Sequence, residues 1–434
     1  MQQVNVGIVG LGTIGMGTLT ILFENAEQIA TKLGFSLGVK ALCDLALDTK
    51  PIPAALGPVQ KTNDWREVVT NPDVDIVVEL IGGTHVARDV VEAAIRNGKS
   101  VVTANKELMA LYGSDIWDRA IGQGVNLGIE ASVAGGIPIL AVLREGIAGD
   151  RVTALFGILN GTCNYILTEI EKHNTPFDIV LMEAQRLGYA EADPTMDVDG
   201  FDARSKLAIL AALAFGERIT PSDIYTEGIR RVLPVDFLYA HQMHYTVRLI
   251  AAARQTPSGL ILSVRPSLIA NSTILAGVRG PYNAIWVRGL YGQDTFYYGR
   301  GAGAQPTGVA VVSDLMRVAR EIRSGSPARV SPFAHERLGE YEPIPITRLK
   351  SAYYLRFRVE DRPGIIARLA AVLADKGISL DAVLQLPEEN WRDLPFVITT
   401  QPTTEESLRA ALAEMATHDY LIETPFAMPM EARL

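Results

Sequence analysis

Cysteine is scarce in this sequence, since Cys43 and Cys163 are the two found among 434 residues. Two cysteines are too few for a disulfide framework, so we expect the chain to work in a reducing compartment. The sequence also has no uninterrupted apolar run close to the ~18 residues that a membrane-spanning helix needs. A basic excess is missing as well, because the formal net charge is -9. That charge argues against nucleic acid and anionic membrane surfaces as partners.

A secretory signal is a further feature that we do not find. The first residues, MQQVNVGIVGLG, lead directly into a predicted strand, without the basic region and apolar core of a signal peptide. Hydrophobic residues make up 48% and charged residues 21%, which is ordinary globular composition, and the length allows two to four domains. These features predict a soluble, cytoplasmic protein.

The first third of the chain alternates predicted strands with predicted helices. Residues 4–9 form a continuous apolar strand, followed by a glycine loop and a helix to about residue 33. Repeated strand–helix–strand units favour an α/β fold with a Rossmann-type, doubly wound parallel sheet that helices cover on both faces. The other strands predicted here are residues 37–42, 75–80, 100–103 and 125–129.

The pattern changes near residue 131, where longer helical stretches and separate strands predict an α+β substrate domain. A helical pattern at residues 308–322 is expected to return to the first domain. The helices predicted in the substrate domain are residues 164–173 and 202–215, and its strands are residues 152–159, 260–264 and 284–289.

Residues 324–349 have the serine, glycine and proline content of a linker. After it, residues 354–359 alternate apolar and polar side chains, as a half-buried strand does. An Asp-Arg-Pro-Gly turn then opens an apolar helix, with Asp361 as its cap, that ends at Gly377. The remaining elements complete the order βαββαβ of a ferredoxin-like unit. They are strands at residues 378–386, 394–400 and 420–423 and a helix with Thr403 and Glu406 as its capping box.

These patterns predict a division into domains. The sequence assigns residues 1–130, plus the returning helix at about 306–323, to a dinucleotide-binding domain, and residues 131–305 to the substrate domain. The linker is residues 324–349, and the ferredoxin-like domain is residues 350–434.

The glycine loop GLGTIG lies directly after a strand and opens a helix, which is the setting of a dinucleotide-binding loop. Gly10 permits the tight turn, Gly12 lets the backbone approach the pyrophosphate, and Gly15 allows close packing of helix and strand. The first helical turn, with Thr13 and Ile14, offers its amide groups to the phosphates.

Asp44, at the end of the second strand, is the predicted partner of the adenine ribose hydroxyls. An acid there favours NAD, whereas NADP requires a nearby cation, for which Lys50 is the closest candidate. The balance leans towards NAD, and both cofactors remain open.

Two segments carry candidate catalytic residues. Lys106 follows a predicted parallel strand, and the carboxyl ends of such strands border the ligand crevice. Asp202 and Lys206 are four residues apart on one face of a predicted helix, with Glu191 in the irregular stretch before it. By themselves these residues also fit a solvated helix start and a surface ion pair. The apolar residues after Lys206 favour a place at the rim of a cleft.

Six segments together resemble homoserine dehydrogenase, in the order of that family and over residues 1 to about 323. The resemblance implies reversible, NAD(P)H-dependent reduction of aspartate 4-semialdehyde to homoserine, and it makes the second domain the catalytic and dimerisation domain. The segments are GLGTIG, TANKELMA, EASVAGGIP, GILNGTCNYIL, GYAEADPTMDVDGFDARSK and GAGAQPT.

The resemblance also implies roles for individual residues. Lys206 resembles the acid–base residue at the substrate oxygen, and Lys106 resembles its partner near the nicotinamide. Such roles fit the residue types, because an ammonium group stabilises and protonates the oxygen that becomes negative during hydride transfer. By matching position, Glu191 and Asp202 bind the substrate amino group, Asn160 and Thr162 line the substrate pocket, and Gly188 and Gly303 contact the nucleotide.

EASVAGGIP resembles the family's structural cation site. The resemblance implies that sodium binds to the side chain of Glu130 and to the main-chain carbonyls of Val133, Gly135 and Ile137, and oxygen ligands suit a hard cation. Read without the family, the segment is a strand followed by a glycine turn.

The C-terminal segment LRFRVEDRPGIIARLAAVLADKGISLDAV resembles the ACT domain. The resemblance implies that an amino acid binds where two such domains pair, and the expected effector is threonine, an end product of the pathway. Paired domains also imply a homodimer or homotetramer.

Alternatives remain at this point. One is an ACT-bearing dehydrogenase of the 2-hydroxy-acid type, which requires a catalytic histidine that no histidine here matches. The other is a non-catalytic amino-acid sensor, against which the presence of Lys106 and Lys206 argues, since a sensor does not need them. Cys163 is expected to be a buried thiol rather than a nucleophile. His241 and His244 are expected on the face of a surface helix rather than in a metal site.

Overall fold

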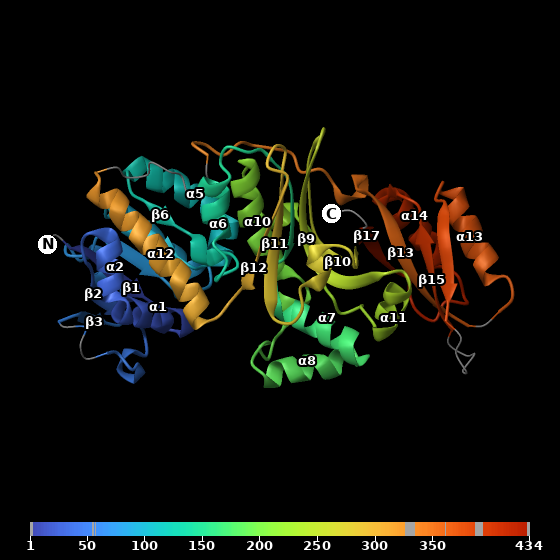
Figure 1. The fold of residues 1–434 in the computed structure, drawn as a ribbon, viewed down its shortest axis with the longest axis horizontal. Coiled ribbons are helices and arrows are strands. Elements are labelled where there is room, and N and C mark those ends of the chain that lie inside the picture. Colours follow the sequence, from blue (N-terminus) through green and yellow to red (C-terminus); the bar gives the residue numbers. More distant parts are fainter. Residues whose placement is uncertain are drawn as a thin grey trace. The chain divides into compact units, whose positions relative to one another are not determined.

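A computed structural model of the chain describes residues 3–53, 56, 58–325, 335–360, 362–386 and 394–431. The chain forms two compact units, each with its own sheet (Figure 1). Across the described residues, no helix combines the length and the hydropathy that crossing a bilayer requires. The first unit comprises Met1–Thr153, Ser205–Ser222 and Arg288–Tyr341, and the second comprises Ala154–Arg204, Asp223–Val287 and Glu342–Leu434.

The first unit contains a six-stranded parallel sheet in the order β3-β2-β1-β4-β5-β6. This is the doubly wound order, in which strands are added first on one side of β1 and then, from β4 on, on its other side, which leaves a crevice at the carboxyl ends of β1 and β4. The predicted Rossmann-type sheet is therefore confirmed. Its strands are β1 (Val4–Val9), β2 (Leu37–Cys43), β3 (Gln60–Thr62), β4 (Ile76–Glu79), β5 (Ser100–Thr103) and β6 (Leu127–Gly128).

The helix predicted to run from the glycine loop to residue 33 is two helices. The break is at Asn25, whose backbone (φ -102°, ψ 15°) leaves the helical region. The returning helix, α12 (Ala304–Arg323), packs against α1, and a Cβ on Gly17 would lie 2.4 Å from the carbonyl oxygen of Ala304 (Figure 1). The other helices of this unit are α1 (Thr13–Glu24), α2 (Ala26–Leu33), α3 (Trp65–Thr70), α4 (His85–Arg96), α5 (Lys106–Gln123) and α6 (Ile139–Ala141), and its last strand is β12 (Asp294–Arg300).

The second unit contains a mixed sheet, which includes β11-β7-β9-β10-β17-β13-β15-β14 in that order. Its longest pair, β9 and β10, is an antiparallel hairpin of which the sequence indicated only residues 260–264. Both strands are buried along most of their length, so the alternation that marks a half-buried strand is missing. The strands are β7 (Val152–Ile158), β8 (Tyr225–Thr226), β9 (Tyr245–Thr256), β10 (Gly259–Ala270), β11 (Tyr282–Gly289), β13 (Lys350–Val359), β14 (Leu380–Gln385), β15 (Leu394–Thr400), β16 (Thr403–Thr404) and β17 (Phe426–Glu431).

The helices of the second unit include α10, which begins in this unit and continues into the first. Its sequence is apolar on nearly every side, as expected for a helix surrounded by protein. The helices are α7 (Gly161–His173), α8 (Phe177–Arg186), α9 (Thr195–Val198), α10 (Phe201–Phe215), α11 (Pro234–Gln242), α13 (Ile365–Asp375) and α14 (Glu405–Met415).

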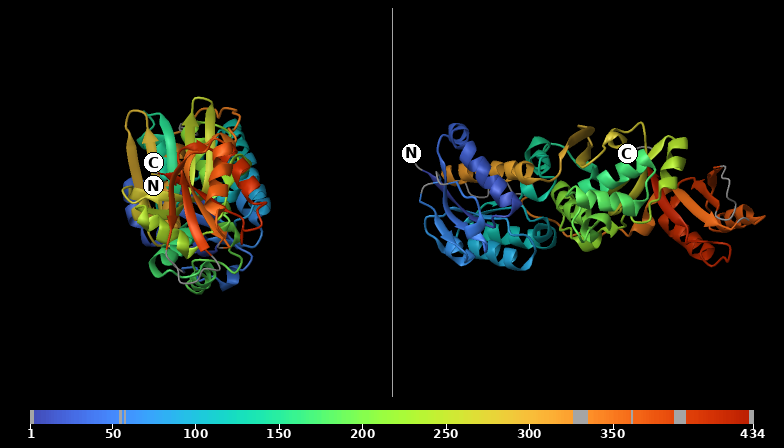
Figure 2. Two further views of the ribbon diagram at one scale, coloured as in Figure 1. Left: turned by 90° about the vertical axis from the view of Figure 1, so that its right-hand side faces the viewer. Right: turned by 90° about the horizontal axis from the view of Figure 1, so that it is seen from below.

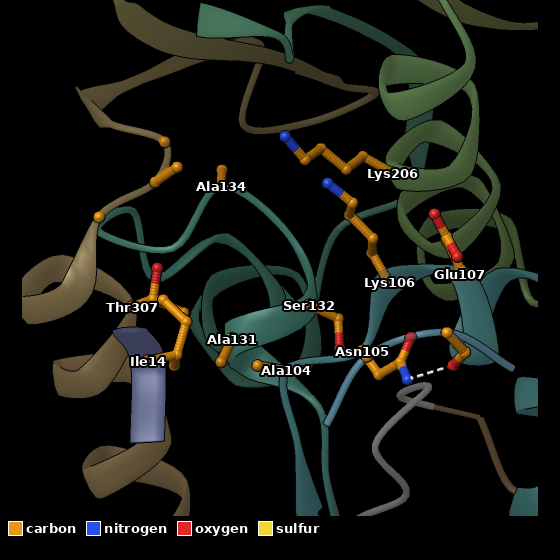
Figure 3. A pocket seen from close by; sticks show the side chains of 15 residues that line it. Ile14, Ala104, Asn105, Lys106, Glu107, Ala131, Ser132, Ala134, Lys206 and Thr307 are labelled. Carbon is orange, nitrogen blue, oxygen red and sulfur yellow. Dashed lines mark hydrogen bonds between the residues drawn. The ribbon is translucent and has the colours of Figure 1, made fainter. Parts of the chain in front are cut away.

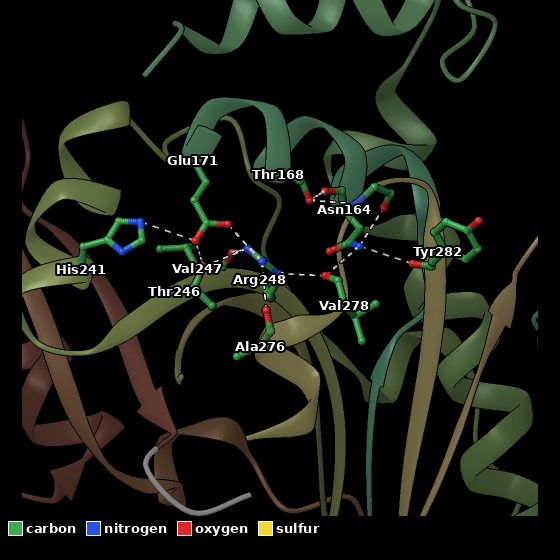
Figure 4. A network of polar contacts seen from close by, with 11 residues as sticks. Asn164, Thr168, Glu171, His241, Thr246, Val247, Arg248, Ala276, Val278 and Tyr282 are labelled. Atoms are coloured by element: carbon green, nitrogen blue, oxygen red, sulfur yellow. Dashed lines mark hydrogen bonds and ion pairs between the residues drawn. The ribbon is translucent and has the colours of Figure 1, made fainter. Parts of the chain in front are cut away.

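A buried polar network fixes α7 on β9 (Figure 4). The fully buried guanidinium of Arg248 donates to Glu171 of α7 (3.1 Å) and to the carbonyl of Ala276 (3.1 Å). The side-chain amide of Asn164, also on α7, donates to the carbonyl of Gly280 at 2.8 Å. Because each buried donor has acceptors, the network sets the position of α7 and of the residues at its N-terminus.

The C-terminal part of the second unit confirms the predicted βαββαβ order. In Figure 2, α13 and α14 lie on one face of the strands, and their apolar side chains share a core with β13 and β15. Its sheet continues into that of the preceding residues, because β17 pairs with both β13 and β10. Asp361, the predicted cap of the first helix, lies outside the described residues.

Three local predictions in the second unit are wrong. The last strand is β17 rather than residues 420–423, of which Leu421 forms only an isolated bridge to Val359. The cap of α14 is Thr404, which accepts a hydrogen bond from the amide of Ser407 (3.3 Å), because Thr403 and Thr404 are paired with β13. His244 lies beyond the end of α11 with φ 64°, so HQMH is a helix end and not a helix face.

Candidate active site

A cavity of about 270 Å³ lies in the first unit, at the carboxyl ends of its parallel strands (Figure 3). Its lining joins the glycine loop, the segment after β5, the residues before α12 and the part of α10 in this unit. These segments are far apart in sequence, so only the folded chain brings them together. Among its lining residues are Ile14, Lys106, Ala134, Lys206, Gly303 and Thr307.

The glycine loop has the geometry that each of its glycines was predicted to supply. Gly10 has φ +99°, and a Cβ there would lie 2.6 Å from the backbone of Leu80. A Cβ on Gly15 would lie 2.1 Å from the carbonyl oxygen of Gly10, which only the absence of a side chain allows. Gly12 faces open space, with nothing within 4 Å of its ideal Cβ position. The first amides of α1, including those of Thr13 and Ile14, have no carbonyl of the preceding turn to bind, which suits an anion.

Asp44 lies next to the glycine loop at the end of β2. Its carboxylate accepts hydrogen bonds from the amides of Leu11 (2.7 Å) and Ala46 (2.8 Å). Lys50 is 3.9 Å away. The carboxylate therefore holds the loop in place, and a carboxylate has lone pairs for further hydrogen bonds.

Lys106 is the first residue of α5. Asn105 caps this helix by accepting a hydrogen bond from the amide of Leu108 (3.1 Å), and its side-chain amide donates to the carbonyl of Gly83 (2.6 Å). The cap fixes the direction in which the helix starts, and hence the direction of Lys106. Figure 3 shows Lys106 and Lys206 extending their amino groups into the same cavity, Lys206 from α10.

Asp202 and Asn160 meet in the second unit, as neighbours in a buried cluster. The side-chain amide of Asn160, the cap of α7, donates to Asp202 (2.8 Å) and to Asp197 (2.7 Å). Asp202 is 2% exposed and lies on α10, one turn before Lys206. The amide thus holds two carboxylates close together, and such a pair suits a positively charged group.

Asp197, which lies next to Asp202, and Glu79, which lies next to the loop at residues 81–83, had no predicted role. Asp197 is five residues before Asp202 and on another helix, so helical spacing gives no signal for it. Glu79 is fully buried at the end of β4, where its carboxylate accepts from Thr103 (2.7 Å) and from the amide of Ile81 (2.7 Å). The sequence signal for Glu79 was an acid at the end of an apolar strand. Its hydrogen bonds hold the loop at residues 81–83, which borders the cavity.

Of the other residues predicted for substrate and cofactor in the second unit, Gly188 and Glu191 are exposed and Thr162 is half-buried. Thr162 donates to the carbonyl of Tyr189 at 2.6 Å, and Glu191 is exposed, with its carbonyl bound by Gln185 at 3.0 Å. Gly188 has φ +76°, in the turn after α8. The structure thus places Thr162, Gly188 and Glu191 on neighbouring turns around residue 189.

Glu130 begins the segment predicted to bind sodium. Its buried carboxylate accepts from the amides of Leu140 (3.0 Å) and Ala141 (2.8 Å), and burial, with a contribution from Asp314, raises its pKa to about 7. The following turn is compact, since a Cβ on Gly135 would lie 2.6 Å from the hydroxyl of Thr307. Val133 and Ile137 are buried, and the Ile137 carbonyl accepts from Ile139 (2.8 Å). Within the described residues, no group of three His, Cys, Asp or Glu side chains is placed to hold a metal ion.

Cys163 and His241 contact groups that hold the fold together. Cys163 is buried, and its thiol donates to the carbonyl of Asp197 at 3.1 Å, which confirms the expected buried thiol. His241 is at the end of α11, 3.7 Å from Glu171 (Figure 4).

The fold and the cavity define a class of protein. A doubly wound sheet with a glycine loop at its crevice, and two lysines in the cavity at the carboxyl ends of its strands, is the arrangement of a nicotinamide-dependent oxidoreductase. Comparison with known proteins gives the family within this class.

Three family models match the chain. They are the NAD-binding domain of homoserine dehydrogenase over residues 10–130, homoserine dehydrogenase over residues 138–316, and the ACT domain over residues 353–416. The chain is 41% identical to a homoserine dehydrogenase of Neisseria gonorrhoeae, over 99% of this chain and 98% of that protein. It belongs to the homoserine dehydrogenase family and is an oxidoreductase with a C-terminal ACT domain.

Solved structures agree with this family. A homoserine dehydrogenase from Thiobacillus denitrificans is 42% identical, with a TM-score of 0.91 over 100% of this chain and 99% of that one. A hyperthermophilic archaeal homoserine dehydrogenase in complex with NADPH is 26% identical, with a TM-score of 0.62 over 73% of this chain and 98% of that one. Family membership excludes the 2-hydroxy-acid dehydrogenase alternative.

Proposed function

We propose that this chain interconverts L-homoserine and L-aspartate 4-semialdehyde in the pathway to threonine, methionine and isoleucine, and that Lys206 and Lys106 handle the charge on the substrate oxygen. The proposal rests on one observation: Lys106 and Lys206 line the same cavity as Ile14 of the glycine loop and Gly303. NAD or NADP, when bound, supplies the hydride acceptor. In the oxidation direction the amine of Lys206 takes the hydroxyl proton, and in the reverse direction its ammonium group returns it.

The substrate amino group is assigned to the carboxylates of Glu191 and Asp202, joined by Asp197. An ammonium group donates charge-assisted hydrogen bonds, for which a pair of carboxylates is the natural acceptor. Asn160 holds Asp197 and Asp202 at 2.7 and 2.8 Å from its own amide, and this supports a preorganised site. Thr162 completes the pocket wall in this proposal.

The glycine loop fits a dinucleotide, since Gly12 faces open space at the start of α1. The pyrophosphate is assigned to the first turn of α1, with Gly10, Gly12, Thr13, Ile14 and Gly15. Asp44 is assigned to the adenine ribose, which favours NAD, and Gly188 and Gly303 to further nucleotide contacts.

The domain assignments accompany this proposal. The cofactor domain is residues 1–130 with the returning helix at about 306–323, the catalytic and dimerisation domain is residues 131–305, and a linker at 324–349 leads to a regulatory domain at 350–434. The matched models support the limit near residue 130 and the C-terminal domain, and the packing of α12 on α1 supports the returning helix. We also propose a homodimer or homotetramer, threonine as the effector, and a cytoplasmic location, to which two buried, unbridged cysteines are suited.

One assay tests the reaction, the cofactor preference and the effector. The purified chain is mixed with L-homoserine and either NAD or NADP, and the absorbance of the reduced nicotinamide is followed with and without L-threonine. We expect reduction of NAD to be faster than that of NADP, because Asp44 repels a ribose phosphate, and threonine to lower the rate. No reduction of either cofactor contradicts the proposed reaction, and a rate that threonine leaves unchanged contradicts the effector.

Sodium is assigned to Glu130 and the carbonyls of Val133, Gly135 and Ile137, and pH tests this site. Burial raises the pKa of Glu130 from 4.5 to about 7, so the folded state favours the protonated form. Without sodium, this contribution to stability is complete below pH 4.5 and is lost as the pH rises through about 7, a change of about 3 kcal/mol. Sodium chloride, but not choline chloride, is expected to restore stability above pH 7, because a bound cation offsets the buried charge.

Urea unfolding at several pH values in each salt measures this effect. Glu130→Gln is expected to remove both the pH slope and the sodium response, while the exposed Glu24→Gln keeps both. Equal stability in the two salts above pH 7 argues against the sodium site.

A further inference from the structure

One side of the loop at residues 229–231 contacts residues 197–199, here called the acidic segment. Arg230 donates to both oxygens of Asp199, at 2.6 and 3.1 Å. The amide of Ile229 donates to the carbonyl of Val198 at 2.8 Å, and both side chains are fully buried. The approach is close, because a Cβ on Gly228 would lie 2.3 Å from that same carbonyl oxygen. The loop is therefore joined to residues 198–199 by an ion pair, a backbone hydrogen bond and close packing.

The C-terminal domain holds the other side of this loop. Arg356 of β13 donates to the carbonyl of Arg231 at 3.1 Å and pairs with Asp236. Arg231 in turn donates to the carbonyls of Thr424 (2.9 Å) and Pro425 (3.1 Å), just before β17. The loop is thus fixed to two separate segments of the ferredoxin-like domain.

The pairing of Arg356 with Asp236 is buried and fully bonded. Arg356 is 2% exposed and Asp236 is 0% exposed. Asp236 also accepts from the hydroxyl of Tyr354 (2.7 Å) and from the amide of Leu233 (2.8 Å), where it caps α11. A buried pair of this kind tolerates few geometries, so β13 and the start of α11 keep a fixed relation.

The acidic segment includes Asp197, which lies next to Asp202, and both carboxylates are assigned to the substrate amino group. Asp197 is two residues before Asp199, it shares the Asn160 amide with Asp202, and its carbonyl accepts from Cys163 at 3.1 Å. A shift of residues 198–199 therefore reaches the groups assigned to the substrate ammonium.

We infer that the loop 229–231 is a clamp by which the C-terminal domain sets the position of the substrate carboxylates, with Arg230 as a positioning residue. The inference rests on the proposed function, because it uses the assignment of Asp197 and Asp202 to the substrate. A ligand that moves β13 or residues 424–425 changes the affinity for homoserine through this clamp, and leaves cofactor affinity unchanged. The coupling is reciprocal, so homoserine changes the affinity for that ligand by the same factor.

Arg230→Ala in the full-length chain tests the clamp at its exposed end. We expect KM for homoserine to rise about tenfold, since a bidentate, charge-assisted contact is lost, while kcat and the dissociation constant for NAD change less than about twofold. Arg230→Lys restores part of the loss. The matched control is Arg288→Ala, which removes another exposed bidentate pair, that with Asp294, and leaves KM unchanged. An Arg230→Ala enzyme with the KM of the unmodified chain overturns the inference.

Arg356→Lys tests transmission from the C-terminal domain. Lysine keeps the charge beside Asp236 but cannot also reach the Arg231 carbonyl with a second fixed donor. We expect KM for homoserine to rise, and the double variant with Arg230→Ala to be no worse than the more affected single variant. A lowered melting temperature with unchanged KM, or fully additive effects, overturns the inference. If the unmodified chain does not oxidise homoserine, it is the proposed function that fails.

Discussion

Replacing Lys206 by alanine is expected to lower kcat for homoserine oxidation by about a thousandfold, the usual scale for loss of a general acid–base group. Lys206 is 7% exposed and points into the cavity that the glycine loop borders (Figure 3). The dissociation constant for NAD is expected to change by less than about twofold, because the pyrophosphate contacts come from the start of α1. Stopped-flow turnover and titration of cofactor fluorescence measure the two effects separately.

A second substitution at this position separates proton transfer from charge. Arginine keeps a positive charge but does not give up its proton, so Lys206→Arg is expected to remain inactive although the oxyanion is still stabilised. Lys61→Ala is the matched control, since Lys61 is an exposed lysine of the same unit, on β3. Full activity of Lys206→Ala contradicts the assignment.

Alanine substitutions at Gly15 and Gly12 are expected to have opposite consequences. Gly15→Ala places a Cβ 2.1 Å from the carbonyl oxygen of Gly10, a rigid backbone atom, so the unfolding free energy is expected to fall by about 3 kcal/mol. Gly12→Ala meets nothing within 4 Å and has an ordinary φ of -69°, so stability is expected to change by less than about 1 kcal/mol. Its Cβ stands where the pyrophosphate approaches, and the dissociation constant for NAD is expected to rise at least about tenfold.

Urea unfolding without cofactor and titration with NAD distinguish the two variants. The pair is its own control, because both add one methyl group to the same loop. Gly12→Ala with unchanged cofactor affinity argues against the pyrophosphate position, and Gly15→Ala with unchanged stability argues against the close packing of α1 on the loop.

The parallel sheet was predictable because its signals are local. The strands β1, β2, β4 and β5 are short, mostly apolar runs, and the glycine loop stands directly after β1. The edge strand β3, of sequence QKT, lacks this signal and was not predicted. The break at Asn25 was not predictable from the apolar pattern, which continues through it into α2. In the second unit, β9 is buried on both faces, so its sequence does not alternate between apolar and polar residues, the pattern by which a half-buried strand is recognised.

The strand β17 shows a different limit. It contains Pro429, which cannot donate to a ladder and so argues against a strand between two neighbours. The structure places Pro429 opposite Tyr353 of β13, while β10 pairs only with Met430 and Glu431. The proline is tolerated because its position lies outside the short pairing with β10, a fact about register that no local pattern contains.

By itself, the sequence determined the elements whose causes lie within a few residues of one another: the glycine turn, the apolar strands and most helix ends, such as Gly98 after α4. The resemblance to a family added roles for Lys106, Lys206 and Asp202. Only the tertiary structure decided that Asn160 binds both Asp197 and Asp202, and that Arg356 holds the carbonyl of Arg231 across 125 positions of chain. Contacts between distant residues depend on how whole elements pack, and packing is a property of the folded chain rather than of any segment.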